Sequence, residues 1–108
     1  MVNHMRVVNA TGAAAVGTTL APGESFRLRE VRIKLSAAGG AGNLTITVDA
    51  GAGAAYDVNL LTQDMTLITS FSWTPDTQLQ FSATDEIDFV WANANTRTYG
   101  LTIYYELL

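Results

Sequence analysis

The loop Gly51-Ala52-Gly53 is the stretch that first suggests chemistry, because glycines after an apolar run can hold a phosphate. A phosphate loop needs a helix after its glycines, with the N-terminus of the helix facing the ligand. The residues at 54–60 instead alternate between apolar and polar, as a strand does. Asp49 and Asp57 flank the loop and would repel a phosphate, and the ligand positions between them lack the side-chain oxygens of a calcium loop. We therefore predict a hairpin turn.

The acidic cluster Asp85, Glu86 and Asp88 is a second candidate, because paired carboxylates can hydrolyse a glycosidic bond. Acids at a turn and at the start of the next strand are more often turn formers on a solvated face. The single histidine, His4, lies near a chain end and has no second imidazole with which to bind a metal. We predict no catalytic residue, no metal site and no cofactor.

Four aromatic residues could form a platform on which a sugar stacks: Trp73, Trp91, Tyr99 and Tyr105. Each of them, however, is in phase with the apolar residues of its own predicted strand, and this pattern favours burial in a core. Their placement separates two functions. Burial of both tryptophans favours a structural protein, whereas a groove that exposes either one favours a carbohydrate-binding module.

The elements that position these residues are strands, because apolar residues recur with a period of two along most of the chain. Turn-forming clusters separate about eight short runs at spacings of roughly 8 to 14 residues, which predicts an all-β antiparallel sandwich. The uneven connections favour an eight-stranded jelly roll. Residues 1–19 are rich in small side chains and are predicted to be an N-terminal strand or arm, separate from a sandwich domain at 20–108 that should fold without it.

The segment SFRLREVRIKL changes its alternation partway along. Phe26 and Leu28 share one parity, whereas Val31 and the apolar residues after it share the other. One extra residue in a strand restores the alignment of its two halves. We therefore predict a β-bulge near Arg29-Glu30 that lets both halves face the same core.

Composition narrows the classes of partner. The 108 residues include no cysteine, one lysine and five arginines, and the net charge is −4. A nucleic acid is an unsuitable partner, because binding to its phosphates depends on clustered cations. The N-terminus does not resemble a signal peptide, and the sequence has no apolar run of about 18 residues, so we expect a protein made in a reducing cytoplasm with no membrane segment.

Two sets of residues are predicted to contact other protein chains. The first set, Val90, Ala92 and Tyr104, lies out of phase with the core, and it would form one apolar patch if the last two strands pair. The second set is a basic stripe on one strand. It either solvates and protects a sheet edge or binds an acidic neighbour. The stripe consists of Arg27, Arg29, Arg32 and Lys34.

Three segments together resemble a family of small β-sandwich proteins encoded among the structural genes of tailed bacteriophages and prophages. They are SFRLREVRIKLS, GNLTITVDAGAGAAYDVNLL and WTPDTQLQFSATDEIDFVWANANTRTYGLTIYYEL. The similarity runs from about Leu20 to Leu107. Its most telling parts are the G-N-L-T-I-T-x-D strand, the Y-D-V strand after a glycine turn, and the D-x-I-x-F-x-W-x-N strand. Thr84 stands where the family commonly has glycine before the acidic turn residue, a departure that leaves the expected fold unchanged.

The resemblance implies a non-enzymatic virion component made in the cytoplasm of a host bacterium. Such proteins are commonly capsid decoration (cement) proteins, head fibres or tail accessories. The implied partners are the phage major capsid protein or other virion subunits, and we expect a homo-oligomer, specifically a homotrimer. The alternative is a carbohydrate-binding module, an adhesin of the tail or head fibre that uses exposed tryptophan or tyrosine.

Overall fold

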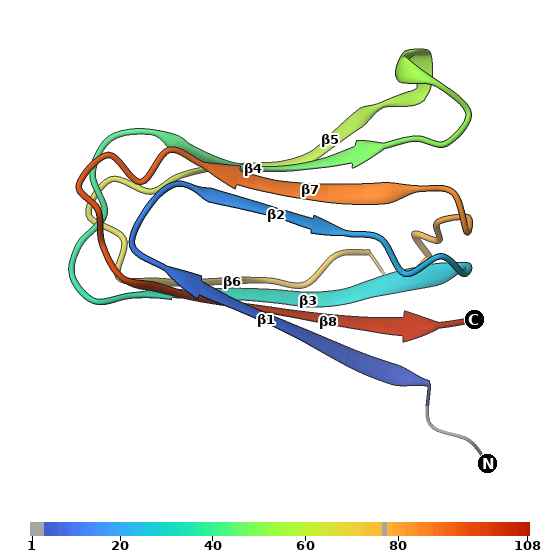
Figure 1. Ribbon diagram of the computed structural model, residues 1–108, viewed down its shortest axis with the longest axis horizontal. Helices are drawn as coiled ribbons and strands as arrows, with labels where there is room; N and C mark the ends of the chain where they lie inside the picture. Colours follow the sequence, from blue (N-terminus) through green and yellow to red (C-terminus); the bar gives the residue numbers. More distant parts are fainter. Residues whose placement is uncertain (1–3, 77) are drawn as a thin grey trace.

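The computed structural model describes residues 4–76 and 78–108 as two facing four-stranded antiparallel sheets (Figure 1). Sheet A has the strand order β1-β8-β3-β6, and sheet B has the order β2-β7-β4-β5. The strands are β1 (Met5–Gly12), β2 (Val16–Leu20), β3 (Phe26–Leu35), β4 (Asn43–Asp49), β5 (Val58–Asp64), β6 (Ser70–Trp73), β7 (Glu86–Trp91) and β8 (Tyr99–Leu107), and a 3-10 turn, η1 (Ala54–Tyr56), precedes β5.

The order of the strands is that of a jelly roll, because most connections cross from one sheet to the other. Strands β1 and β2 lie in different sheets, and so do β2 and β3, β3 and β4, β5 and β6, β6 and β7, and β7 and β8. Strands β4 and β5 are the one pair of described strands that are neighbours both in sequence and in a sheet. The predicted all-β sandwich of eight strands is confirmed, and its topology is that of the double-sheet jelly roll.

The core lies between the sheets and consists of the side chains that alternate inward along the strands. Trp91 is fully buried and Tyr99 is buried, in agreement with their predicted phase. Trp73 and Tyr105 are partly buried and pack against the same core. Met65, in the loop after β5, is also fully buried. The aromatic residues of the strands therefore serve mainly to fill the sandwich.

The predicted bulge in β3 is present. The pairing of β3 with β8 shifts register between Leu28 and Glu30. As a result, the apolar residues before the shift and those after it all point into the core. The buried residues of this strand are Phe26, Leu28, Val31, Ile33 and Leu35.

The N-terminal residues do not form a separate arm, which corrects the boundary predicted between residues 19 and 20. Strand β1 pairs with β8 at the edge of sheet A, and β2 pairs with β7 at the edge of sheet B. The predicted boundary falls inside β2, where Val16 is 1% exposed and Leu20 is 3% exposed. Residues 1–3 of the predicted arm lie outside the described residues. An edge strand needs few large side chains, so the small residues here are compatible with a place in the sheet.

The glycine loop is a hairpin turn between β4 and β5, as predicted. Gly51 passes so close to the turn at 82–85 that a Cβ on it would collide with the side chain of Thr84. The Gly51 N–H donates a hydrogen bond to Asp85 Oδ1 at 3.0 Å. Glycine is required here because two turns approach each other. The strand after the loop begins at Val58, and Tyr56 lies in η1 instead.

Candidate binding surfaces

Two carboxylates of the acidic cluster, Asp85 and Asp88, accept hydrogen bonds from neighbouring turns and strands. Asp85 accepts hydrogen bonds from the N–H groups of Ser82 at 2.9 Å and Gly51 at 3.0 Å. These bonds, first that from Ser82 and then that from Gly51, lower the pKa of the Asp85 carboxyl. Asp88 accepts a hydrogen bond at 2.7 Å from the Thr19 hydroxyl on the neighbouring strand. Among residues 4–76 and 78–108, no three histidine or acidic side chains are grouped to hold a metal ion.

Asp85→Asn should remove a pH-dependent part of the stability. Because the pKa of Asp85 is lower in the folded chain than in the unfolded chain, its stabilising effect is present above the unfolded value of about 4. That effect is lost as the pH falls through the folded pKa. Urea denaturation at pH 7 and at about pH 3 should show a smaller loss of stability on acidification in the variant than in the wild type. Equal losses in the two proteins would contradict the role assigned to this carboxylate.

The first predicted interface set is divided between two faces, which corrects the prediction of one patch. That prediction required β7 and β8 to pair, but the two strands lie in opposite sheets. Val90 lies on the outer side of sheet B and is 49% exposed, and Ala92, just after the end of β7, is also exposed. Tyr104 lies on β8 in sheet A, between the outward-facing residues Val7 and Glu30 in the strand register.

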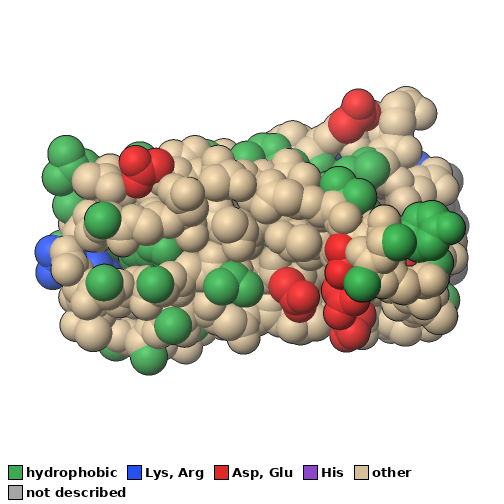
Figure 2. All heavy atoms as spheres, turned by 90° about the horizontal axis from the view of Figure 1, so that it is seen from above, with side chains coloured by type: hydrophobic (Ala, Val, Ile, Leu, Met, Phe, Trp, Pro, Cys, Tyr) green, Lys and Arg blue, Asp and Glu red, His purple; other side chains and the backbone are tan. Residues whose placement is uncertain are grey.

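The outer face of sheet B is poor in large side chains. Val90 is paired in register with Gly17 on one side and Thr45 on the other. Seen from the side of β4 and β5, the surface shows acidic groups and small apolar groups, with lysine and arginine near the ends of the molecule (Figure 2). Val90, exposed between these small neighbours, is the apolar group that this part of the face offers to another surface.

The second predicted set, the basic stripe, is on β3 in the interior of sheet A, between β8 and β6. The alternative of a protected sheet edge is therefore wrong. Arg27 Nη1 and Arg29 Nη1 both approach Glu106 Oε1, at 3.5 Å and 3.7 Å. The guanidinium of Arg32 donates to both carboxylate oxygens of Glu30, at 2.6 Å and 3.3 Å.

The pair formed by Arg32 and Glu30 fixes the centre of this face. The hydrogen bond from Arg32 lowers the pKa of the Glu30 carboxyl, and the same bond raises the pKa of Arg32. The guanidinium carbon of Arg32 lies 5.2 Å from the centroid of the Tyr104 ring, within cation–π range. One face of that ring is therefore covered by an arginine.

A groove of about 400 Å³ crosses sheet A beside the β3 bulge. It combines two guanidinium groups, a carboxylate, a hydroxyl and an aromatic wall from four strands or their ends. The lining residues are Met5, Arg29, Glu30, Arg32, Thr74 and Tyr104. Of these, Met5, Glu30 and Thr74 are not among the predicted contact residues, and neither is Glu106 beside the groove, because no local motif connects them.

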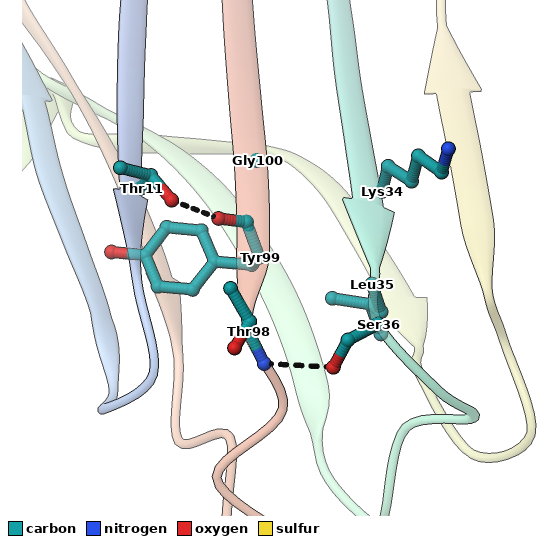
Figure 3. Close-up of a pocket in the computed structure, with 7 residues that line it drawn as sticks. All are labelled: Thr11, Lys34, Leu35, Ser36, Thr98, Tyr99 and Gly100. Atoms are coloured by element: carbon teal, nitrogen blue, oxygen red, sulfur yellow. Dashed lines mark hydrogen bonds between the residues drawn. The ribbon is translucent and has the colours of Figure 1, made fainter.

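A second hollow, of about 310 Å³, lies where β1, β8 and β3 meet near Gly100 (Figure 3). Its polar groups mostly bond to one another: the Thr11 hydroxyl donates to the Tyr99 carbonyl at 2.7 Å, and the Thr98 N–H donates to Ser36 Oγ at 3.1 Å. The Lys34 side chain extends away from these groups (Figure 3). The hollow is a notch left by Gly100, where a Cβ would meet no atom within 4 Å.

The strand order and the two facing sheets define a small jelly-roll sandwich. No family model matches the sequence, and no curated protein matches it. The solved structures that it resembles include the Drosophila NLP core, described for pentamer formation and histone binding, at 7% identity and a TM-score of 0.51, covering 96% of this chain and 97% of that one. A second is the SPBc2 prophage-derived protein YomS, at 12% identity and a TM-score of 0.38, covering 96% of this chain and 97% of that one. A third is a family 16 carbohydrate-binding module, at 14% identity and a TM-score of 0.41, covering 90% of this chain and 73% of that one. Identities this low show the fold alone.

Proposed function

We propose that the protein is a non-enzymatic structural component of a tailed-phage particle, a capsid decoration (cement) protein that stabilises the coat through repeated protein–protein contacts. The observation that carries the proposal is the pair of broad outer faces on a rigid sandwich. One presents Val90 and Ala92, and the other presents the basic stripe with Tyr104. The acidic residues that could have served catalysis are instead bonded within turns and between strands.

Repetition explains how modest surfaces of this kind can act on a capsid. A coat presents the same site many times, and a homo-oligomer, for which we propose a trimer, would engage several sites together. Linked contacts raise the overall affinity well above that of any single contact. In this proposal the protein is made in the bacterial cytoplasm and resides in the virion, with the major capsid protein or another virion subunit as its partner.

A carbohydrate-binding module is the weaker alternative because of where the aromatic side chains lie. Trp91 is fully buried, Trp73 is partly buried against the core, and the ring of Tyr104 is covered on one face by Arg32. Tyr56 is exposed, but it lies in η1, outside the strands of both sheets. A sugar platform needs a free aromatic face beside polar groups, and in the groove on sheet A the Arg32 guanidinium occupies one face of the aromatic ring.

The test is to purify particles from an induced host on a density gradient and to count the copies of this chain by quantitative mass spectrometry. We expect a fixed ratio of this chain to the major capsid protein, and loss of particle stability when the gene is deleted. Particles that contain none of the chain would overturn the proposal. A glycan array with selective binding that survives removal of particles would favour the alternative.

A further inference from the structure

We propose that the groove beside the β3 bulge is a carboxylate-binding site for an acidic peptide segment of the partner protein, with Arg29 as the principal contact. The proposal rests on the proposed function in one respect only, namely that the partner is a protein. Three features of sheet A support such a site: the bulge, an imbalance of charge, and the covered ring of Tyr104.

The bulge brings two consecutive charged residues to the same side of the sheet. In a regular strand, neighbouring residues point to opposite faces. Here the register shift lies between Leu28 and Glu30. Arg29 contacts Glu106, and Glu30 contacts Arg32, so both members of the pair reach outward-facing partners. Bulges commonly re-aim a side chain in this way beside functional sites.

The charges at this end of the groove are out of balance. Arg27 and Arg29 share the single carboxylate of Glu106, at 3.5 Å and 3.7 Å. Charge-assisted hydrogen bonds are usually about 2.7–2.9 Å long, so Glu106 satisfies neither guanidinium well. Arg27 Nε is buried and has no hydrogen-bond partner among the described residues. A second carboxylate in the groove would supply Arg29, which lines it, with an acceptor that it does not have to share with Arg27.

The remaining wall of the groove is preorganised. Glu30 binds Arg32 through two hydrogen bonds, and Arg32 in turn lies against Tyr104. Arg32 is therefore held in place, whereas Arg29 has one long contact and keeps donors for a ligand. A guanidinium presents its donors in a planar fork that matches a carboxylate.

A protein ligand fits the groove better than an acidic sugar does. Sugars are held by stacking on an open aromatic face as well as by hydrogen bonds, and Arg32 occupies one face of the Tyr104 ring. The groove is also open and crosses several strands, so an extended chain can lie along it with an aspartate or glutamate beside Arg29. A uronic-acid sugar is the competing ligand.

The experiment titrates acetyl-tetraglutamate amide into the isotope-labelled full chain and follows backbone and arginine side-chain NMR signals. We expect shifts at Arg29 and its neighbours, and none with the tetraglutamine peptide. Arg29→Gln should weaken binding by about tenfold or more, the change expected for losing a hydrogen bond to a charged group. Lys34→Gln removes the same charge from the same strand outside the groove, and it should change affinity by less than about twofold at moderate salt.

Glu106→Gln should change the peptide affinity in the opposite direction from Arg29→Gln. Removing the carboxylate that competes for Arg27 and Arg29 should tighten peptide binding several-fold, even if the variant melts slightly lower. Equal losses for Arg29→Gln and Lys34→Gln, or weaker binding by Glu106→Gln, would overturn the site. Tighter binding of trigalacturonate than of the peptide would overturn the choice of a protein ligand. Peptide binding by a chain that is absent from particles would leave this site standing and reject the capsid role.

Discussion

A chain lacking residues 1–19 should fail to fold cooperatively. The deletion removes all of β1 and most of β2, so β8 and β7 each lose one of the two strands with which they pair. It also removes Val16, which is buried in the core, and leaves Leu20 without the strand that holds it. Each buried aliphatic side chain contributes about 1.5–3 kcal/mol, and a domain of this size has a total stability of about 5–15 kcal/mol.

Circular dichroism melting and a two-dimensional NMR spectrum test this expectation. The truncated chain should show no sharp transition and poorly dispersed signals. Gly17→Ala in β2 is the matched control, because a Cβ at this position meets no atom within 4 Å, and the variant should melt like the wild type. A truncated chain that melts sharply near the wild-type temperature would restore the separate-arm interpretation.

Trp91→Ala should lower the free energy of unfolding by about 3–5 kcal/mol, the usual cost of emptying a large aromatic site in a core. The ring packs close to Gly39 and Gly42, whose backbones leave it room. Neither glycine can fill the cavity. Relaxation of the loop at 39–42 should therefore recover little of the loss.

Trp91→Phe is the informative companion. Trp91 Nε1 is buried and has no hydrogen-bond partner in the described structure, and phenylalanine lacks this polar group. We expect a clearly smaller loss than for alanine when both variants are measured by urea denaturation. If Trp91→Ala instead melts like the wild type and loses binding to a glycan, the carbohydrate-binding alternative gains the support that it now lacks.

The sequence predicted which side chains are buried better than it predicted which strands are neighbours. Alternation with a period of two records burial of one face, so it placed Trp91 and Tyr99 in the core. The change of parity in β3 was sufficient to locate the bulge between Leu28 and Glu30. Alternation carries no information about pairing, and Val90 and Tyr104 were therefore assigned to one patch although they lie on different sheets.

The groove could not be predicted from the sequence either, because it too depends on which strands pair. The basic stripe is local in sequence and was noticed, but its counter-charge comes from a distant strand. Arg27 and Glu106 are 79 residues apart and meet only because β3 and β8 pair. Residues 1–19 have the small-residue composition of an arm, whereas the signal for β2 is limited to the two apolar residues that bracket it, Val16 and Leu20. The edges of a sheet tolerate small side chains, so their composition resembles that of a loop.

The strand order also constrains how the chain can acquire its structure during synthesis. Strand β1 cannot pair until β8 has been synthesised, and β2 cannot pair until β7 has been synthesised. Among the described strands, β4 and β5 are the one pair that can form a hairpin from adjacent segments. Proteins dominated by pairings between distant residues fold slowly, because a long loop must close before any contact forms. We expect this chain to emerge from the ribosome with little stable structure beyond that hairpin. Sheet A would then close last, when β8 becomes available between β1 and β3.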